Sequence, residues 1–328
     1  MFDLITFGGL IVEFIRPELD IPLDKPGLFM GPFPSGASAI TISTAARLGL
    51  NTAFIGIVGD DFFGKYVFAR LETDGVSLNH VLRVPGMPTG IAFVSYKRNG
   101  TRSFNYVTDY SKVNLNAPEL NTQSIEKSKW IHTNGTMLGK RSIWKSYGKS
   151  LIEKTLHEGG NLSFDPNFRP ELIDMKASRI LYEPYIRMCR HFMPSEEEIL
   201  AYFETNSLEK AIDLALELGP DIVCVKRGDK GCIVASQREA PIEVPAFSVN
   251  CIDPTGAGDC FDAGFIFAQE RGLSLWESAL FANAVGAFAV SQMGPMEGSP
   301  YLYELEPLFQ ENEDLKSIFN KLKPNENT

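Results

Sequence analysis

The sequence predicts an α/β protein, in which a central, mostly parallel sheet is covered by helices on both faces as a three-layer αβα fold. Short runs rich in β-branched and aromatic residues alternate with stretches of helical pattern along most of the 328 residues. One segment leaves this alternation and has the pattern of a hairpin. We therefore expect a single domain over 1–328 with a small β-sheet lid inserted into it.

The alternation is visible element by element. The expected strands of the central sheet are Leu4–Phe7, Thr52–Val58, Trp130–His132, Leu162–Phe164, His191–Met193 and Ile222–Lys226. The expected helices between them are Ala37–Leu48, Phe62–Asp74, Ile143–His157, Glu196–Phe203 and Leu208–Leu218. Parallel strands need crossover connections of this kind, which place helices on the sheet's faces.

The lid is expected from Ile91–Val107. Two strands, Ile91–Lys97 and Arg102–Val107, are joined there by a turn that contains Asn99-Gly100, a strong hairpin signal. Leu10–Arg16, just after the first strand of the chain, is the expected partner. The lid strands should therefore come from about residues 10–17 and 91–107.

Composition and charge exclude several classes of protein. The formal net charge is −10, whereas general binders of nucleic acid or anionic membranes need a basic surface. No apolar run reaches the roughly 18 residues of a membrane span, and the N-terminus does not resemble a signal peptide. The five cysteines form no Cys-x-x-Cys pair, which favours reduced, buried thiols over a disulfide framework or zinc site. We expect a cytoplasmic protein.

The most informative motif is Asp253-Pro254-Thr255-Gly256-Ala257-Gly258-Asp259-Cys260-Phe261. It follows the strand-like run Ile242–Val249 and precedes the helical run Phe261–Arg271. Gly-Ala-Gly before a helix allows the backbone to approach a ligand closely. The free N–H groups and the positive end of the helix dipole favour a phosphate or a developing oxyanion there.

Asp259 follows this anion site directly. A carboxylate in that position can accept the proton of an attacking hydroxyl while the backbone cradle stabilises the transferred phosphoryl group. The simpler interpretation is an acidic residue in the first turn of a helix, favoured by the dipole alone. The whole nine-residue context favours the catalytic interpretation.

Asp253–Phe261 resembles the C-terminal signature of the ribokinase-like carbohydrate kinases, the PfkB family, and the resemblance extends over nearly the whole chain. Further segments match the family's motifs in its order and spacing: Gly36–Gly49, Phe54–Gly64, Asp165–Arg169, Lys226–Gly231 and Met293–Gly298. This resemblance implies transfer of the γ-phosphoryl group of Mg-ATP to a primary hydroxyl of a sugar. It also implies closure of the lid and a homodimer formed through it.

The resemblance implies roles for particular residues. Asp259 would be the catalytic base; Gly256, Ala257 and Gly258 the anion hole; and Lys226, Gly228 and Asn283 the ATP-binding residues. Glu198 would organise Mg²⁺ through water, although Ser195 stands where the family has Asn and the four residues 195–198 fit a helix N-cap equally well. Asp253, with backbone carbonyls near Thr255 and Gly294, would hold K⁺ or a similar ion.

The acceptor side departs from the family pattern. Ser35-Gly36 replaces a Gly-Gly pair, and Ile40 replaces an Asn that binds hydroxyl groups. Glu13 is the nearest match to a sugar-binding Asp, or else a surface charge of the lid. The remaining candidates for contact with the substrate are Gly36, Arg102, Asn105, Tyr106 and Arg169. Strand alternation predicts that Arg102, Phe104 and Tyr106 share one face, and Asn105 lies on the other.

These departures bear on the identity of the acceptor. Kinases of 2-keto-3-deoxygluconate carry Arg in the lid strand where this chain has Val107, which favours a neutral ketohexose such as fructose. Arg169 could still pair with an acid, because its fork suits a carboxylate, or it could pair with Glu171 or Asp174. A 2-keto-3-deoxygluconate kinase, a nucleoside kinase and a non-catalytic sugar- or nucleotide-binding regulator remain the alternatives.

Gly59–Tyr66 nearly matches a P-loop but has Tyr66 where Ser or Thr must ligate Mg²⁺. We therefore expect Lys65 to be a solvated helix residue.

Overall fold

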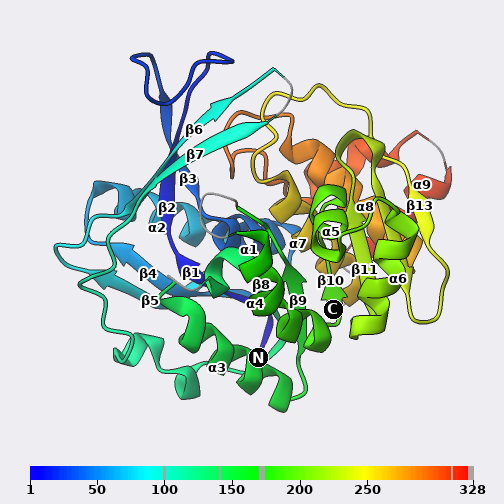
Figure 1. Cartoon of the computed structure of the whole chain (residues 1–328), viewed down its shortest axis with the longest axis horizontal. Helices are drawn as coiled ribbons and strands as arrows, with labels where there is room; N and C mark the ends of the chain where they lie inside the picture. Colours follow the sequence, from blue (N-terminus) through cyan, green and yellow to red (C-terminus); the bar gives the residue numbers. More distant parts are fainter. Residues whose placement is uncertain (99–100, 140–141, 170–173, 312, 324–328) are drawn as a thin grey trace.

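The computed structural model describes residues 1–98, 101–139, 142–169, 174–311 and 313–323 (Figure 1). Two sheets organise the part of the chain within these ranges. The larger contains β1 (Phe2–Gly9), β4 (Thr52–Gly59), β5 (Ser77–Val84), β8 (Ser128–Asn134), β9 (Asn161–Asp165), β10 (His191–Phe192), β11 (Ile222–Lys226), β12 (Cys232–Ser236) and β13 (Ile242–Val244). The smaller contains β2 (Ile11–Ile15), β3 (Met30–Ser35), β6 (Gly90–Tyr96) and β7 (Arg102–Val107).

The large sheet has the order β13-β12-β11-β10-β9-β8-β1-β4-β5. Its strands pair in parallel from β5 to β11. At the other edge, β12 pairs antiparallel with both β11 and β13. The mostly parallel sheet predicted from the sequence is therefore confirmed. The predicted run Ile242–Val249 is correct only to Val244, because Pro245 has no backbone N–H for the ladder.

Helices cover both faces of this sheet. They are α1 (Ala37–Leu48), α2 (Phe62–Thr73), α3 (Trp144–His157), α4 (Met175–Met188), α5 (Glu196–Phe203), α6 (Leu208–Leu218), α7 (Ala257–Glu270), α8 (Leu275–Ala289) and α9 (Glu313–Leu322). Short 3₁₀ turns lie at Pro118–Leu120, Thr122–Ser124, Gly135–Leu138, Gly228–Lys230 and Leu302–Phe309. The five helices predicted between the strands agree with the structure to within one residue at each end. The helical run predicted over Phe261–Arg271 begins too late, since α7 already begins at Ala257.

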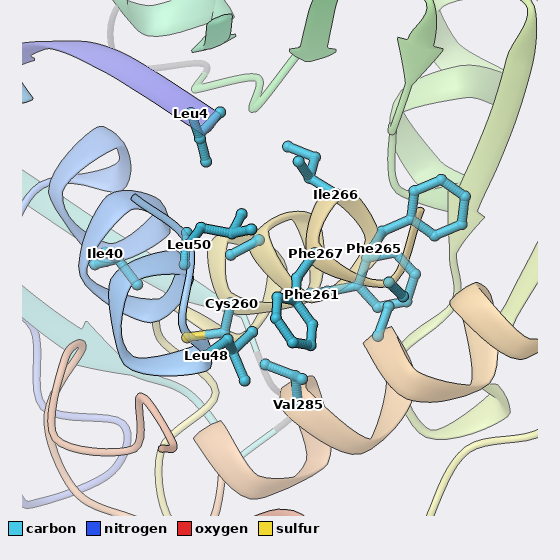
Figure 2. Close-up of a cluster of buried hydrophobic side chains, with 14 of the residues drawn as sticks. Leu4, Ile40, Leu48, Leu50, Cys260, Phe261, Phe265, Ile266, Phe267 and Val285 are labelled. Carbon is cyan, nitrogen blue, oxygen red and sulfur yellow. The ribbon is translucent and has the colours of Figure 1, made fainter. Parts of the chain in front are cut away.

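Two apolar cores flank the sheet. One joins α1, α7 and α8 to one face, and the other joins α3, α4 and α6 to the opposite face. Figure 2 shows α7 in the middle of the first core, between α1 and α8, with Phe261 and Phe267 labelled among its buried side chains. Phe265 lies on the side of α7 toward the large sheet, where its ring is 5.1 Å from that of His191. Every residue from Asp259 to Ala268 is buried, so α7 is apolar on nearly all sides. Its N-terminal turn is consequently held in a fixed position.

The small sheet has the order β3-β2-β6-β7 and projects beyond one side of the large sheet (Figure 1). It contains the three strands predicted for the lid and adds β3, which the sequence does not suggest, because Pro32 and Pro34 interrupt its pattern. Proline is tolerated in β3 because β3 is an edge strand. The Asn99-Gly100 turn lies outside the described residues.

All five cysteines are free thiols. Four of them are buried as expected, whereas Cys251 is exposed in the loop before α7, which corrects the prediction for that residue. Among the helices that the structure describes, none has the length and apolar character needed to cross a membrane.

Candidate active site

The polar residues of the site gather where parallel strands end. β9 ends at Asp165 and β11 ends at Lys226, and the first turn of α7 lies beside them. The carboxyl edge of a parallel sheet is where ligands bind in open α/β folds. Residues that are far apart in the sequence therefore converge at one edge.

The loop before α7 depends on glycine at a particular position. Gly256 has φ +81°, and a Cβ atom there would lie 2.3 Å from the carbonyl oxygen of Pro295. Residue 256 is the N-cap of α7, so the first N–H groups of the helix, from Ala257 onwards, have no partner within the helix. Gly256, Ala257 and Gly258 thus form a backbone cradle at the positive end of a helix.

Asp259 lies in the first turn of α7 and is 8% exposed. Its Oδ1 atom has no hydrogen-bond partner among the described residues. Burial, and then the nearby carboxylate of Asp165, raise the pKa of Asp259 to about 6, although Lys226, Arg169 and Arg102 act in the opposite direction. The residue is therefore a buried carboxylate with a free oxygen, ionised at neutral pH.

Lys226 lies beneath the cradle, and its Nζ is 3.5 Å from where a Cβ of Gly258 would be. The ammonium donates to Asp165 Oδ2 at 2.9 Å and to Asp262 Oδ1 at 3.0 Å. Two of its three N–H groups thus donate to carboxylates, and the third has no acceptor among the described residues.

Asp253 holds the far side of the loop. Its Oδ1 accepts hydrogen bonds from the Thr255 N–H at 2.9 Å and from the Tyr96 hydroxyl at 2.6 Å. Its Oδ2 accepts from the Gly294 N–H at 2.9 Å. Tyr96 belongs to the small sheet, so this carboxylate connects the small sheet to the cradle.

Glu13, which is predicted to contact the acceptor, lies on β2 of the small sheet. Glu13 is 4% exposed, and its Oε2 atom has no partner in the described ranges. Burial, and then repulsion by Asp253 and Asp259, raise the pKa of Glu13 to about 7, while Ser35 and Arg102 lower it. Its burial argues against the alternative of a surface charge.

Two arginines lie over one aromatic ring on the same side. The Cζ atoms of Arg102 and Arg169 are 5.7 Å and 5.6 Å from the centre of the Phe104 ring, which stacks on Tyr106. Residues at even positions of β7 are half-buried and those at odd positions are exposed, as alternation predicts. Asn105 therefore lies on the other face and is not brought together with the other residues predicted to contact the acceptor.

Two other predicted residues, Glu198 and Asn283, have hydrogen-bond partners within the protein, whereas Gly228 lies at the surface. Glu198 forms a capping box with Ser195, and its Oε1 accepts from the Phe168 N–H at 2.6 Å. Asn283 donates to the Val244 and Pro245 carbonyls. Gly228 has φ +60°, and a Cβ atom there would meet nothing within 4 Å, so this residue borders open space.

Gly36 begins α1 with φ 115°, and Ile40 packs 3.4 Å from the Cβ position of Gly256. Ile40 therefore supports the cradle from below rather than presenting a polar group. Asp174 caps α4, where its Oδ1 accepts from the Ala177 N–H, and Glu171 lies outside the described residues. Lys65 is exposed, as predicted.

Sequence reasoning missed three residues here: Tyr96, His132 and Asp262. Asp262 carries one signal, since it lies three residues after Asp259 and hence on the same side of the helix. His132 and Tyr96 lie in apolar strands, and nothing in the sequence indicates which residues they contact.

Residues 3–301 match the family of pfkB carbohydrate kinases. A fructokinase of Salmonella typhimurium is 30% identical over 284 residues, which is 84% of this chain and 92% of the relative. A fructokinase of Vibrio alginolyticus is 29% identical over 308 residues, covering 91% and 96%.

Solved structures show the same fold. An E. coli protein provisionally named ribokinase II, solved in complex with ATP and Mg²⁺, has a TM-score of 0.85 and 34% identity, covering 95% of this chain and all of its own. The fructokinase of Vibrio cholerae O395, bound to fructose, ADP and calcium, has a TM-score of 0.79 and 25% identity, covering 93% of this chain and 98% of its own.

Proposed function

Because the chain belongs to the pfkB family of carbohydrate kinases, we propose that it transfers the γ-phosphoryl group of ATP to a primary hydroxyl of a sugar, with Asp259 as the base. The observation that carries this proposal is the buried Asp259 carboxylate, which keeps a free oxygen beside the cradle of Gly256, Ala257 and Gly258.

The proposed chemistry follows from these positions. Asp259 accepts the proton of the attacking hydroxyl, and its pKa of about 6 keeps it ionised at neutral pH yet basic enough to take that proton. The backbone N–H groups at the start of α7 stabilise negative charge on the transferred group. Closure of the small sheet over the site would exclude water.

ATP would be held by Lys226, Gly228 and Asn283. The free N–H of Lys226 beneath the cradle and the open space at Gly228 support this assignment. Asn283 uses its amide donors on backbone carbonyls, which leaves its side-chain oxygen for the nucleotide.

Mg²⁺ supplies neutralisation of phosphate charge when bound. In the described part of the chain, no group of three or more acidic, His or Cys side chains is placed to hold a metal ion. Glu198 already accepts three hydrogen bonds, two on Oε2 and one on Oε1, so it fits a role through a bridging water only.

A monovalent cation fits less well at Asp253. Two donors occupy its Oδ1, and only Oδ2 keeps a free lone pair. Backbone carbonyl oxygens near Thr255 and Gly294 would supply most of the ligands of such an ion. An assay with and without K⁺ tests this requirement.

For the acceptor we propose a ketohexose, most simply fructose. The fructokinase relatives support this choice, as does the buried Glu13, whose carboxyl group can bind sugar hydroxyls beside Gly36. Arg102 and Tyr106 line the same side.

A second acceptor, 2-keto-3-deoxygluconate, is favoured by one observation. Arg102 and Arg169 approach the same Phe104 ring, so two cations face the acceptor side although Val107 supplies none. Paired guanidinium groups suit a carboxylate.

The small sheet also has an edge strand, β7, and an exposed Val107 on its outer face, 53% exposed. We propose that this sheet acts as the lid of a single kinase domain and pairs with a second copy. Light scattering after size exclusion would show a dimer, and a monomer at micromolar concentration would contradict it.

A coupled ADP-release assay with Mg-ATP tests the function and the acceptor together. Fructose, 2-keto-3-deoxygluconate, ribose and adenosine are compared at equal concentration. Turnover on fructose alone supports a ketohexose as the acceptor. Turnover on 2-keto-3-deoxygluconate alone supports binding of its carboxylate by the arginine pair. If none is phosphorylated, sugar and nucleotide binding measured by calorimetry would support a binding protein without turnover.

A further inference from the structure

One ammonium group faces three carboxyl groups beneath the proposed anion hole. Lys226 contacts Asp165 and Asp262 directly, and Asp259 lies one helical turn before Asp262. The side chains of Asp165 and Asp262 are only 6% and 0% exposed. Arg169 and Arg102 also act on Asp259, whereas Lys226 is the cation that acts on Asp262. A buried charge without a partner is costly, so Lys226 alone does not support both Asp165 and Asp262 as ionised carboxylates.

Asp165 is fully satisfied as an ionised carboxylate. Its Oδ1 accepts from the Asn167 N–H at 2.9 Å, and its Oδ2 accepts from Lys226 at 2.9 Å. Burial opposes ionisation, but Lys226 and the Asn167 N–H outweigh it, and the pKa of Asp165 lies below its ordinary value.

Asp262 is satisfied on one oxygen only. Its Oδ1 accepts from Lys226, while Oδ2 is buried without a hydrogen-bond partner in the described ranges. Oδ2 instead faces Nε2 of His132 at 3.9 Å, and that nitrogen is also buried and unpartnered there. The other ring nitrogen of His132, Nδ1, is 3.0 Å from Ser163 Oγ.

The surroundings offer no second cation for Asp262 among the described contacts. β11 contributes Lys226 and Cys224, β9 contributes Asp165, β8 contributes His132, and α7 itself contributes Asp259. Beyond His132 lies His191, whose pKa is lowered to about 3 by burial and then by Arg190 and His132. Burial likewise lowers the pKa of His132 to about 4, so both rings are neutral.

We propose that Asp262 is a positioning residue that carries its own proton on Oδ2, directed at Nε2 of His132. In the His132 tautomer that donates Nδ1–H to Ser163, Nε2 carries a lone pair that faces Oδ2 from 3.9 Å. That separation is longer than a direct hydrogen bond, so the acid proton points toward the lone pair and removes the buried charge from Oδ2, which has no other partner among the described residues. The carbonyl-like Oδ1 still accepts from Lys226.

The role of Asp262 in catalysis rests on the proposed function of this site as a kinase. The neutral Asp262 ties the first turn of α7 to the end of β11 through Lys226, without adding a negative charge beside Asp259. Asp165 remains the ionised partner that raises the pKa of Asp259.

Matched Asn variants separate the two carboxyl groups. Asp165→Asn removes a charge and should move the acid limb of the kcat/KM profile to lower pH by about one unit. Asp262→Asn removes none and should move it by less than about 0.3 units. An equal, large shift in both variants would overturn the proposal, because Asp262 would then be ionised.

Infrared spectroscopy tests the proton without any turnover. In the wild type, the carbonyl stretch of a protonated carboxylic acid should persist above about pH 8. The other buried acid, Glu13, has a pKa of about 7 and could contribute to this band, so the Glu13→Gln variant is measured as well, and the band should persist in it. Absence of that band from Glu13→Gln would refute a protonated Asp262, even if no acceptor were phosphorylated. Loss of the band in Asp262→Asn assigns it to this residue.

Discussion

The hydroxyl of Tyr96, the last residue of β6, donates a hydrogen bond of 2.6 Å to the carboxylate of Asp253, which lies in the loop before α7. Phe33 and Met293 pack with Tyr96 around this bond. Through it, the position of the small sheet is coupled to the backbone cradle.

Tyr96→Phe removes this bond and leaves the ring in place. Because the backbone cradle then loses one hydrogen bond that fixes its position, we expect kcat/KM to fall about tenfold. A factor of this size corresponds to the free energy that one hydrogen bond to a charged group contributes. Tyr147→Phe is the control, since its buried hydroxyl has no partner among the described residues. Equal activity of both variants would show that the coupling has no catalytic consequence.

Gly256→Ala tests the cradle. The new Cβ would lie 2.3 Å from the Pro295 carbonyl oxygen at a φ of +81°, so the loop must move. We expect at least about 2 kcal/mol loss of unfolding free energy, and a loss of turnover. Gly228→Ala also has positive φ but meets nothing within 4 Å, and should cost about 1 kcal/mol. Urea unfolding of both variants compares the two values.

The ionised carboxylate of Asp259 should lower the free energy of unfolding at neutral pH. Its pKa is raised to about 6 from 3.8, so the folded state binds the proton more tightly than the unfolded state. Stability therefore falls as pH rises between these two values and stays lower above about pH 6. Asp259→Asn should stabilise the protein by about 2–3 kcal/mol at about pH 8.

The control for that measurement is Asp213→Asn, on the exposed face of α6, for which we expect no change in stability. Thermal unfolding at about pH 4 and pH 8 measures both variants. A stabilisation that is the same at the two pH values would contradict the raised pKa.

Arg169→Gln distinguishes the two acceptors. If the arginines bind a carboxylate, KM for 2-keto-3-deoxygluconate should rise about 10- to 100-fold, because a charge-assisted hydrogen bond is lost. KM for fructose should change less than about threefold. Arg98→Gln, just after β6 of the small sheet, is the control, since Arg98 is exposed and pairs with Asp20.

The decrease of kcat/KM at low pH should follow the protonation of Asp259. Because the base must be ionised, kcat/KM should fall tenfold per pH unit below about pH 6 and level off above it. A profile that is flat down to about pH 4 would exclude Asp259 as the group that limits the rate.

Much of this fold could be predicted from local pattern. Helices such as α1 begin and end at glycines visible in the sequence, and the parallel strands are short apolar runs. β5 escaped prediction because Asn79, His80 and Arg83 interrupt its apolar pattern, and its identity as a strand depends on pairing with β4.

The site was predictable only where one segment carries it. The cradle and Asp259 lie within nine consecutive residues. The contacts of Lys226 with Asp165 and Asp262 join β11, β9 and α7, and the bond from Tyr96 to Asp253 joins two sheets. Such pairings depend on topology, which local sequence does not specify.

The role of Asp259 as the base is best tested by comparing wild type with Asp259→Asn in phosphoryl transfer from ATP to the accepted sugar, with phosphorus NMR identifying the product. We expect a sugar phosphate from the wild type and a loss of about 10²- to 10⁴-fold in kcat for the variant. Sugar binding by calorimetry should stay within about threefold. A variant that retains more than about a tenth of the wild-type kcat would contradict Asp259 as the base.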